Sequence, residues 1–490
     1  MTALGPGALV WAGFDGAQAP GALLDAIRAG QIGGVLLFAL RGNIRSGEQV
    51  RAMLREIQAA ALAGGYPPVP VGVDQEGGSV VRLGYRAVFP SAMALGAIGD
   101  VALVERVAGA VAAGLRADGI AVNHAPVCDV NVEPRNPVIN TRSFGDDPAT
   151  VAQLAAAWVR GSEGAGVATT PKHFPGHGVS PVDSHHTTVD VHADRATLEG
   201  RELVPFRAAL AAGASGVMTA HVRYPALDAD NIATLSPAIL TRLLRDELGF
   251  TGLLMTDSLD MAGITQVETQ GAVVARAVRA GIDAVMVTTG IELQVAASER
   301  IATQVPAARV LEALRRADEF RRRFGVTVPD QEFDDDPARE LAALVARRSI
   351  TRVGPAQPQL DSMRVTFLGA PRLSPVEELH DPLGVFEAAL RERFRDRVVF
   401  GHEGQVPDGD APLVLCSSSA AFDAEQTARL RALAPRAALL CAMRSPYDVL
   451  LAPELPALLS YGEVPVSLEA LAAVLAGERA PEGRPPVRLS

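Results

Sequence analysis

The chain has 490 residues, which is too many for one ordinary domain, so we expect two or three domains. Hydrophobic residues make up 48% of it and charged residues 21%, a composition typical of globular proteins. The formal net charge is −11 and no basic stretch offsets it, which argues against nucleic acid or an anionic membrane surface as a partner.

Short apolar runs recur through the N-terminal two thirds of the chain, each followed by a polar loop and a helical stretch. Eight such runs lie at 8–14, 34–38, 69–74, 120–127, 167–173, 216–221, 252–257 and 283–288. Continuous apolar strands that alternate with helices are typical of a parallel sheet covered on both faces. Eight repeats predict an α/β fold with a (β/α)8 TIM-type barrel. A doubly wound open sheet is the alternative, because spacing alone does not prove closure.

The predicted barrel ends with a helix over 309–324, so we assign residues 1–325 to it. Residues 326–349 are expected to be a polar linker and a connecting helix. A smaller α/β unit follows over 350–490, with strands near 365–368, 413–416 and 438–443. We expect this unit to supply no catalytic residue, because its polar residues show no clustering at strand ends.

Polar and ionisable residues follow most of the barrel strands. The segments at the strand ends read VDQEGG, NHAPVCDVN, TPKHFPGHG, TAHV, TDSLDM and VTT. Barrel enzymes carry their chemistry at the carboxyl ends of the strands. Asp257 ends one apolar strand, where a carboxylate can act as a nucleophile, a general base or a metal ligand.

A loop rich in histidine follows the fifth strand. Residues 169–190 read TTPKHFPGHGVSPVDSHHTTVD and hold four of the nine histidines. Residues two apart in an extended loop point the same way, so Asp183 is positioned to hydrogen-bond His185 and fix its tautomer. This pair predicts a general acid/base. The alternative for Asp183 is a simple turn residue.

Further polar residues at the strand ends are candidates for binding a substrate. They are Asp74, Arg82, Arg142, Lys172, His173 and His221. The alternative for each arginine is an exposed surface charge. The alternative for His173 is a packed, hydrogen-bonded interior residue.

Several of these segments together resemble glycoside hydrolase family 3, and in particular its β-N-acetylglucosaminidase branch. They are DQEGGSVVR at 74–82, RSFG at 142–145, KHFPGHG at 172–178, DSH at 183–185 and TDSLDM at 256–261. KHFPGHG followed closely by DSH is specific for that branch. RSPYD at 444–448, YG at 461–462 and PEGRPPV at 481–487 resemble the family's C-terminal α/β sandwich domain, so the resemblance spans the chain.

The resemblance implies a retaining, exo-acting enzyme that removes terminal β-N-acetylglucosamine. It makes Asp257 the nucleophile, His185 the general acid/base and Asp183 its orienting partner, with the binding candidates holding the sugar. It implies a carbohydrate substrate and neither cofactor nor metal, and it identifies no protein partner. Ser79, where an Arg is common, and residues 179–181 depart from the usual pattern on the leaving-group side.

The implied substrates are peptidoglycan fragments with N-acetylglucosamine on (anhydro-)N-acetylmuramic acid, or chitooligosaccharides. A histidine acid is neutral after giving up its proton, so it would not repel an anionic acceptor in the second step. Phosphate could then replace water as the acceptor, which would make the enzyme a phosphorylase. Two further alternatives are a non-catalytic sugar-binding protein and a metal-dependent barrel hydrolase. The metal ligands of the latter would be His173, His177, His185 and Asp257.

The sequence favours a cytoplasmic location. The N-terminus lacks the charged and apolar regions of a signal peptide, and no apolar stretch reaches the roughly 18 residues of a membrane span. The three cysteines, Cys128, Cys416 and Cys441, are far apart in the sequence and form no CxxC motif, so we expect no disulfide framework.

Overall fold

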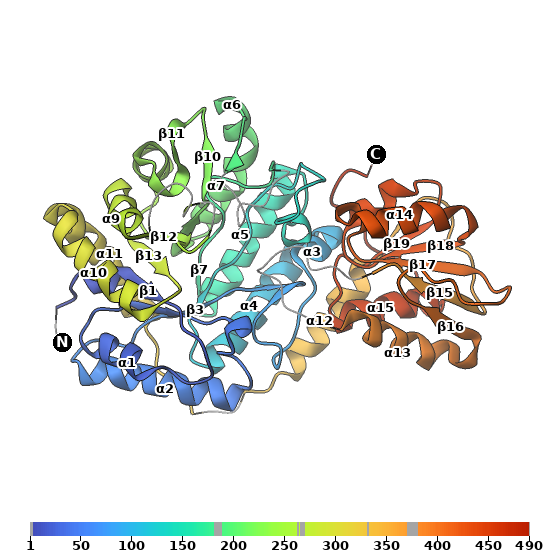
Figure 1. Cartoon of the computed structure of the whole chain (residues 1–490), viewed down its shortest axis with the longest axis horizontal. Coiled ribbons are helices and arrows are strands. Elements are labelled where there is room, and N and C mark those ends of the chain that lie inside the picture. The colour runs from blue at the N-terminus through green and yellow to red at the C-terminus, as the bar shows by residue number, and fades with distance from the viewer. Residues whose placement is uncertain are drawn as a thin grey trace.

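Eight parallel strands form the first part of the molecule (Figure 1). The computed structural model describes residues 3–180, 189–261, 264, 270–330, 333–369 and 381–489. In order around the sheet the strands are β1 (Val10–Ala12), β2 (Gly34–Leu36), β3 (Val71–Val73), β6 (Val122–Asn123), β7 (Ala168–Thr169), β9 (Gly216–Thr219), β12 (Leu253–Ser258) and β13 (Ala284–Val287). Each coincides with one of the eight predicted runs, which confirms the predicted fold class.

The sheet closes on itself between β7 and β9. Phe174 N donates to Met218 O at 2.9 Å, Met218 N to Pro171 O at 3.1 Å, and Ala220 N to Phe174 O at 2.9 Å. β1 pairs with both β2 and β13, so the ring is complete. The alternative of an open, doubly wound sheet is therefore wrong.

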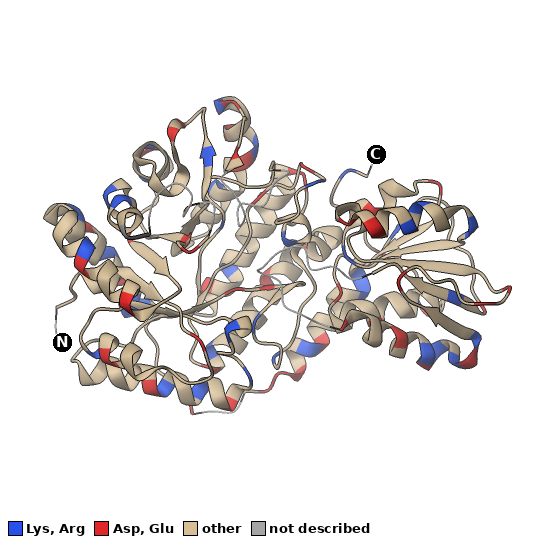
Figure 2. Ribbon diagram, in the orientation of Figure 1, with Lys and Arg blue, Asp and Glu red and all other residues tan. Residues whose placement is uncertain are grey.

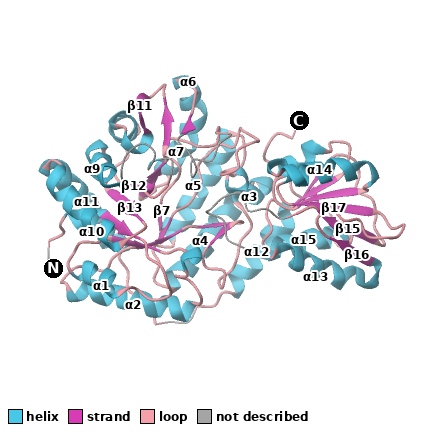
Figure 3. Cartoon of the chain, in the orientation of Figure 1, coloured by secondary structure: helices cyan, strands magenta, loops and turns pink. Residues whose placement is uncertain are grey.

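Helices cover the outside of the barrel (Figure 3). They are α1 (Gly21–Arg28), α2 (Gly47–Ala63), α4 (Val101–Ala117), α5 (Pro148–Gly164), α7 (Leu203–Ala211), η6 (Ala238–Glu247), α9 (Gln270–Ala280), α10 (Ile291–Gln304) and α11 (Ala307–Phe324). Several begin at a capping side chain, as at Asp100, whose carboxylate accepts a hydrogen bond from Leu103 N at 3.1 Å. Arg residues and Asp or Glu residues are interspersed along these outer helices (Figure 2).

A hairpin and a small sheet stand above the carboxyl ends of the barrel strands. The hairpin consists of β4 (Gln75–Gly77) and β5 (Val80–Val81), and the small sheet of β8 (Val189–Asp190), β10 (Val222–Tyr224) and β11 (Asp228–Ile232). The short helix α3 (Ala92–Ile98) follows the hairpin.

The C-terminal unit is built on a second, six-stranded sheet. Its order is β14 (Thr351–Val353), β19 (Ala457–Leu459), β18 (Leu439–Ala442), β17 (Leu413–Ser417), β15 (Met363–Phe367) and β16 (Val398–Gly401). Only the β14–β19 pair is antiparallel. The helices that cover it are α13 (Pro382–Phe394), α14 (Ala424–Leu433), α15 (Pro465–Leu475) and the short η10 (Pro446–Leu451). Cys416 and Cys441 are register partners on β17 and β18, and both thiols are free.

The two units share a hydrophobic core. Met93, Ala94 and Ala97 of α3 pack in one cluster with apolar residues of the second sheet, such as Leu415 and Leu459. The connecting helix α12 (Asp336–Ser349) lies between the units in Figure 1 and contacts α3, α4 and α15. We propose 1–325, 326–349 and 350–490 as the domain organisation. In the described part of the chain, no helix has both the length and the apolarity needed to cross a membrane.

Candidate active site

A buried lysine joins two carboxylates at the mouth of the barrel. Lys172 Nζ lies 2.6 Å from Asp74 Oδ1 and 2.7 Å from Glu76 Oε1. Asp74 directly follows β3, Glu76 lies on β4, and Lys172 follows β7. Arg82 approaches the other oxygen of Asp74 at 3.8 Å. Lys172 is the only lysine in the sequence.

Arg142 extends this network on the far side of Glu76. Its Nε and Nη2 each donate to one carboxylate oxygen of Glu76 at 2.8 Å, a bidentate pair. The same Nη2 lies 3.5 Å from His173 Nε2. Arg82 and Arg142 are both buried, so the alternative of exposed surface arginines is wrong.

The charges within the network stabilise one another. Burial would raise the pKa of the Glu76 carboxyl, but Arg142 and Lys172 lower it to about 2. Burial would likewise raise the pKa of Asp74, yet Lys172 and Arg82 hold it well below its usual range. Burial lowers the pKa of Lys172, and the two carboxylates more than offset this. All of these groups are therefore charged at neutral pH.

Asp129 fixes the start of the histidine loop. Its Oδ2 lies 2.8 Å from His173 Nδ1, and its Oδ1 accepts from His177 N at 2.6 Å. A neutral His173 with Nδ1 protonated would present Nε2 as an acceptor toward the network. His173 is thus a packed, hydrogen-bonded interior residue at the edge of the lysine network, and its part in substrate binding stays a prediction.

Asp257 is half-buried at the carboxyl end of β12. Ser258 N donates to its Oδ1 at 2.7 Å. Its charge also acts on His124, whose pKa burial lowers to about 4 while Asp74 and Asp257 raise it. The candidate nucleophile and the lysine network therefore influence the same buried imidazole.

His221 contacts the backbone beside Asp257. Its Nε2 lies 2.9 Å from Ser258 O and its Nδ1 lies 2.7 Å from Thr234 Oγ1. Both ring nitrogens thus have protein partners, and the residue is buried. This arrangement fits a residue that positions the end of β12.

The predicted acid/base pair, Asp183 and His185, lies outside the described residues. The segment that leads to it is held by the loop after β6: Glu133 N donates to Gly178 O at 3.3 Å, and Asn136 Nδ2 to His177 O at 2.9 Å. A Cβ at Gly178 would lie 1.8 Å from Val130 O, so only glycine fits there.

The sequence interpretation missed four residues of the site. Glu76 and Asp129 lie within segments that had been singled out, but they had no assigned role, and His124 and Thr234 were missed as well. Glu76 could have been found, because it lies two residues after Asp74 and residues two apart in extended chain share a face. For the metal alternative, no group of three or more His, Cys, Asp and Glu among the described residues could hold an ion.

The expectation of no polar clustering at strand ends in the C-terminal unit is wrong. Buried polar residues gather at the end of β17 and beyond β17 and β18, namely Ser417, Ser418, Ser419, Arg444, Ser445 and Asp448. Ser417 Oγ donates to Asp448 Oδ2 at 2.6 Å, and burial raises the pKa of Asp448 to about 6. From the sequence these residues are expected to lie in exposed loops. The sequence does not show that the carboxyl ends of β17 and β18 face the barrel.

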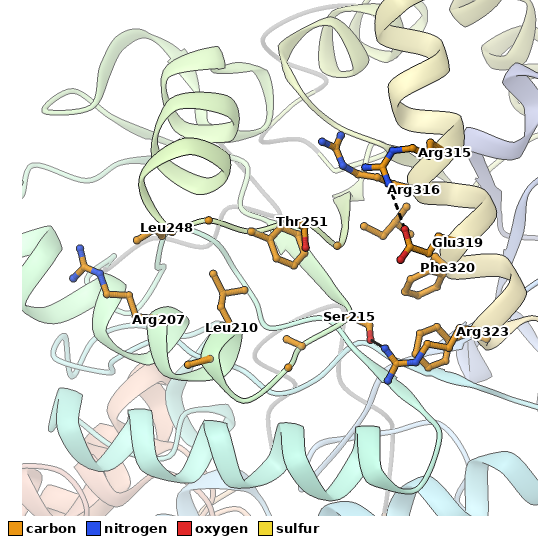
Figure 4. A pocket seen from close by; sticks show the side chains of 18 of the residues that line it. Arg207, Leu210, Ser215, Leu248, Thr251, Arg315, Arg316, Glu319, Phe320 and Arg323 are labelled. Atoms are coloured by element: carbon orange, nitrogen blue, oxygen red, sulfur yellow. Dashed lines mark hydrogen bonds and ion pairs between the residues drawn. The ribbon is translucent and has the colours of Figure 1, made fainter.

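A cavity of about 820 Å³ opens at the opposite end of the barrel (Figure 4). It lies before β9 and β12 and beside α11. Two of its arginines form ion pairs: Arg315 lies 3.5 Å from Glu319, and Arg323 Nη2 lies 3.1 Å from Glu163. Since barrel chemistry occurs at the carboxyl ends of strands, we place the candidate active site at the lysine network and not in this cavity.

Comparison with known proteins identifies the family. The glycosyl hydrolase family 3 N-terminal domain matches residues 17–319. The chain belongs to glycosyl hydrolase family 3. It is therefore a glycoside hydrolase, as the resemblance implied.

Its relatives include named hexosaminidases. β-Hexosaminidase A of Pseudoalteromonas piscicida is 40% identical over 265 residues, which are 50% of this chain and 44% of that protein. The β-hexosaminidase of Stenotrophomonas maltophilia strain K279a is 40% identical over 247 residues, 49% of this chain and 70% of that protein. This chain thus matches less than half the length of the first relative.

Solved structures match along the whole chain, among them the following enzyme. It is a glycoside hydrolase family 3 β-N-acetylglucosaminidase from Paenibacillus sp. str. FPU-7, 32% identical, with a TM-score of 0.92. The match covers 100% of this chain and 99% of that one.

Glu202 of this hydrolase lies buried next to Gly176, in the described first part of the histidine loop. A Cβ at Gly176 would lie 2.9 Å from its Oε2, and its Oε1 accepts from Arg201 Nε at 2.5 Å. Burial outweighs the ion pair and raises the pKa of Glu202 to about 7. Glu202 is a titratable group that the sequence interpretation also missed.

Replacing Lys172 by Arg should lower kcat/KM by about 100-fold, even though the substitution keeps the positive charge. A planar guanidinium does not reproduce a compact ammonium between two carboxylates. Kinetics on an aryl N-acetylglucosaminide would measure the effect, with the exposed Arg322→Lys as control. Wild-type rates for Lys172→Arg would contradict it.

The folded state should lose stability as Glu202 ionises. Its pKa is raised on folding from 4.5 to about 7, so its contribution is fully present below pH 4.5 and is lost as pH rises through 7. Since one pKa unit corresponds to about 1.4 kcal/mol, Glu202→Gln should therefore gain roughly 3 kcal/mol over the wild type between pH 4.5 and 8. Urea unfolding at several pH values would measure this, with the exposed Glu56→Gln as control. A pH-independent difference would show that Glu202 does not titrate in this range.

Proposed function

We propose that the chain is a retaining, exo-acting β-N-acetylglucosaminidase that removes terminal non-reducing β-linked N-acetylglucosamine. The observation that carries the proposal is the position of Asp257 at the end of β12, near the charged network around Lys172. The names of the two hexosaminidases and of the full-length structural relative support the sugar specificity.

The network suits the hydroxyl groups of a sugar. Hydroxyls both donate and accept, and the network offers carboxylate acceptors on Asp74 and Glu76 beside cationic donors. Two of the three ammonium protons of Lys172 point to those carboxylates, which leaves the third for a sugar oxygen. Arg142 and His173 would bind at the adjoining edge, where their side chains meet.

The proposed reaction has two steps. The Asp257 carboxylate attacks the anomeric carbon, and the glycosidic bond breaks as His185 gives its proton to the leaving oxygen. Water then attacks the anomeric carbon of the glycosyl ester, and His185 takes up a proton from that water. The ester bond breaks, which releases the sugar and restores the Asp257 carboxylate. Asp183 would orient His185, and His221 would hold Ser258 and so the end of β12 that carries Asp257.

We further propose peptidoglycan fragments or chitooligosaccharides as substrates, which the family resemblance implies. We propose the cytoplasm as the location, which fits three cysteines that are far apart in the sequence and form no CxxC motif. Phosphate in place of water in the second step would release the sugar 1-phosphate instead of the free sugar. Product analysis with and without inorganic phosphate separates hydrolase from phosphorylase.

Asp257→Ala should lower kcat by at least about 10³-fold while the fold is kept, because a half-buried carboxylate at the mouth contributes little to packing. A 5-fluoro N-acetylglucosaminide should trap an ester on the wild-type enzyme, located by peptide mass spectrometry. Fragmentation must distinguish Asp257 from nearby Asp260. A label on any other residue would contradict the assignment of the nucleophile.

His185→Ala should slow substrates with poor leaving groups by roughly 10²- to 10⁴-fold, because these need a proton in the transition state. An activated aryl leaving group should be affected far less. His186→Ala is the matched control and should show no such dependence. A larger leaving-group effect in His186→Ala would mean that the acid/base was assigned to the wrong histidine.

A further inference from the structure

The loop between β6 and α5 carries two residues of the candidate site. Asp129 near its start holds His173, and Arg142 near its end holds Glu76. Apart from the single turn η3 (Asn140–Arg142), residues 129–146 form neither helix nor strand. We call this segment the 129–146 loop.

The two ends of the 129–146 loop are bonded to each other. Asn131 N donates to Gly145 O at 2.9 Å, and Ser143 Oγ donates to Asp129 O at 2.6 Å. A displacement of Asn131 is therefore passed to both ends, and so to Asp129 and Arg142.

The C-terminal unit forms hydrogen bonds with the 129–146 loop from outside the barrel. The buried hydroxyl of Tyr447 accepts from Asn131 Nδ2 at 2.8 Å and donates to Asn131 O at 3.4 Å. Ser445 Oγ lies 3.4 Å from Asn140 Nδ2. Pro486 O accepts from Asp146 N at 3.1 Å. Each contact joins residues more than 300 positions apart in the sequence.

We propose that Tyr447 is a positioning residue of the active site, which holds Asn131 and through it places Arg142 and His173 for the sugar. The inference rests on the proposed function, because it assigns those two residues to sugar binding. It gives the C-terminal unit a part in substrate affinity although it supplies no group to the reacting atoms.

The test compares two tyrosines that each lose a hydroxyl. Tyr447→Phe should raise KM about tenfold with kcat changed less than threefold, because binding is lost equally in ground and transition states. Tyr85→Phe removes a bond of similar length, 2.9 Å to Asp118 at the end of α4, and should leave KM unchanged. Asn131→Ala breaks the Tyr447 bond from the barrel side, and the double variant should be no worse than either single one.

The single lysine supplies a second measurement. Lys172 N donates to Pro126 O and Lys172 O accepts from Cys128 N, so its backbone is bonded to the chain just before the loop. Protein labelled with ¹⁵N-lysine gives one backbone amide signal. That signal should move in Tyr447→Phe and Asn131→Ala and stay in place in Tyr85→Phe.

The inference is overturned if Tyr447→Phe matches Tyr85→Phe in KM, if its effect adds to that of Asn131→Ala, or if the lysine signal does not move. Should Tyr447→Phe fail to fold, Asn131→Ala alone decides by the same KM and signal criteria. Arg142→Ala separates the two proposals. Wild-type KM in that variant overturns the assigned sugar site itself, whereas a raised KM beside an unaffected Tyr447→Phe overturns only the positioning role.

Discussion

The ammonium of Lys172 between Asp74 and Glu76 is the interaction on which the mouth of the barrel depends. It joins segments that follow β3 and β7, and through Glu76 it reaches Arg142 on the 129–146 loop. Burying an ion costs several kcal/mol unless partners offset it, so each charge here needs its neighbours. Lys172 is the only lysine of the chain, and it lies where the carboxylates of Asp74 and Glu76 both approach a single nitrogen atom.

Much of this arrangement could be predicted from the sequence. Eight apolar runs indicated the strands, and the fixed place of chemistry in a barrel brought Asp74, Lys172 and Asp257 to one end. The pairing could not be predicted. Arg142 meets Glu76 across 66 positions and His173 meets Asp129 across 44, and hydrophobic periodicity does not tell which loop folds over which strand end.

In the C-terminal unit the sequence also did not predict which polar residues are buried. Its serines and Arg444 read as loop residues, and only the packed structure shows them buried. Strand β17 and α3 lie far apart in the sequence yet share one apolar cluster, so the polar residues beyond β17 and β18 are enclosed by a neighbour that local sequence does not reveal. The polarity of these residues predicted that they would be exposed, but packing against a distant part of the chain buries them.

The loops explain why the two units belong together. Strand ends of a barrel are fixed by their sheet, but the 129–146 loop has almost no regular backbone pairing of its own. Asp129 on that loop must nevertheless meet the buried His173, and Arg142 must meet the buried Glu76 carboxylate, where an error in geometry leaves a charge without its partner. The barrel fixes the loop at its base and the second unit fixes it at Asn131 and Asp146. The buried ionic network is thus carried on an irregular loop that the C-terminal unit contacts from outside the barrel, and this contact is the basis of the positioning role proposed for Tyr447.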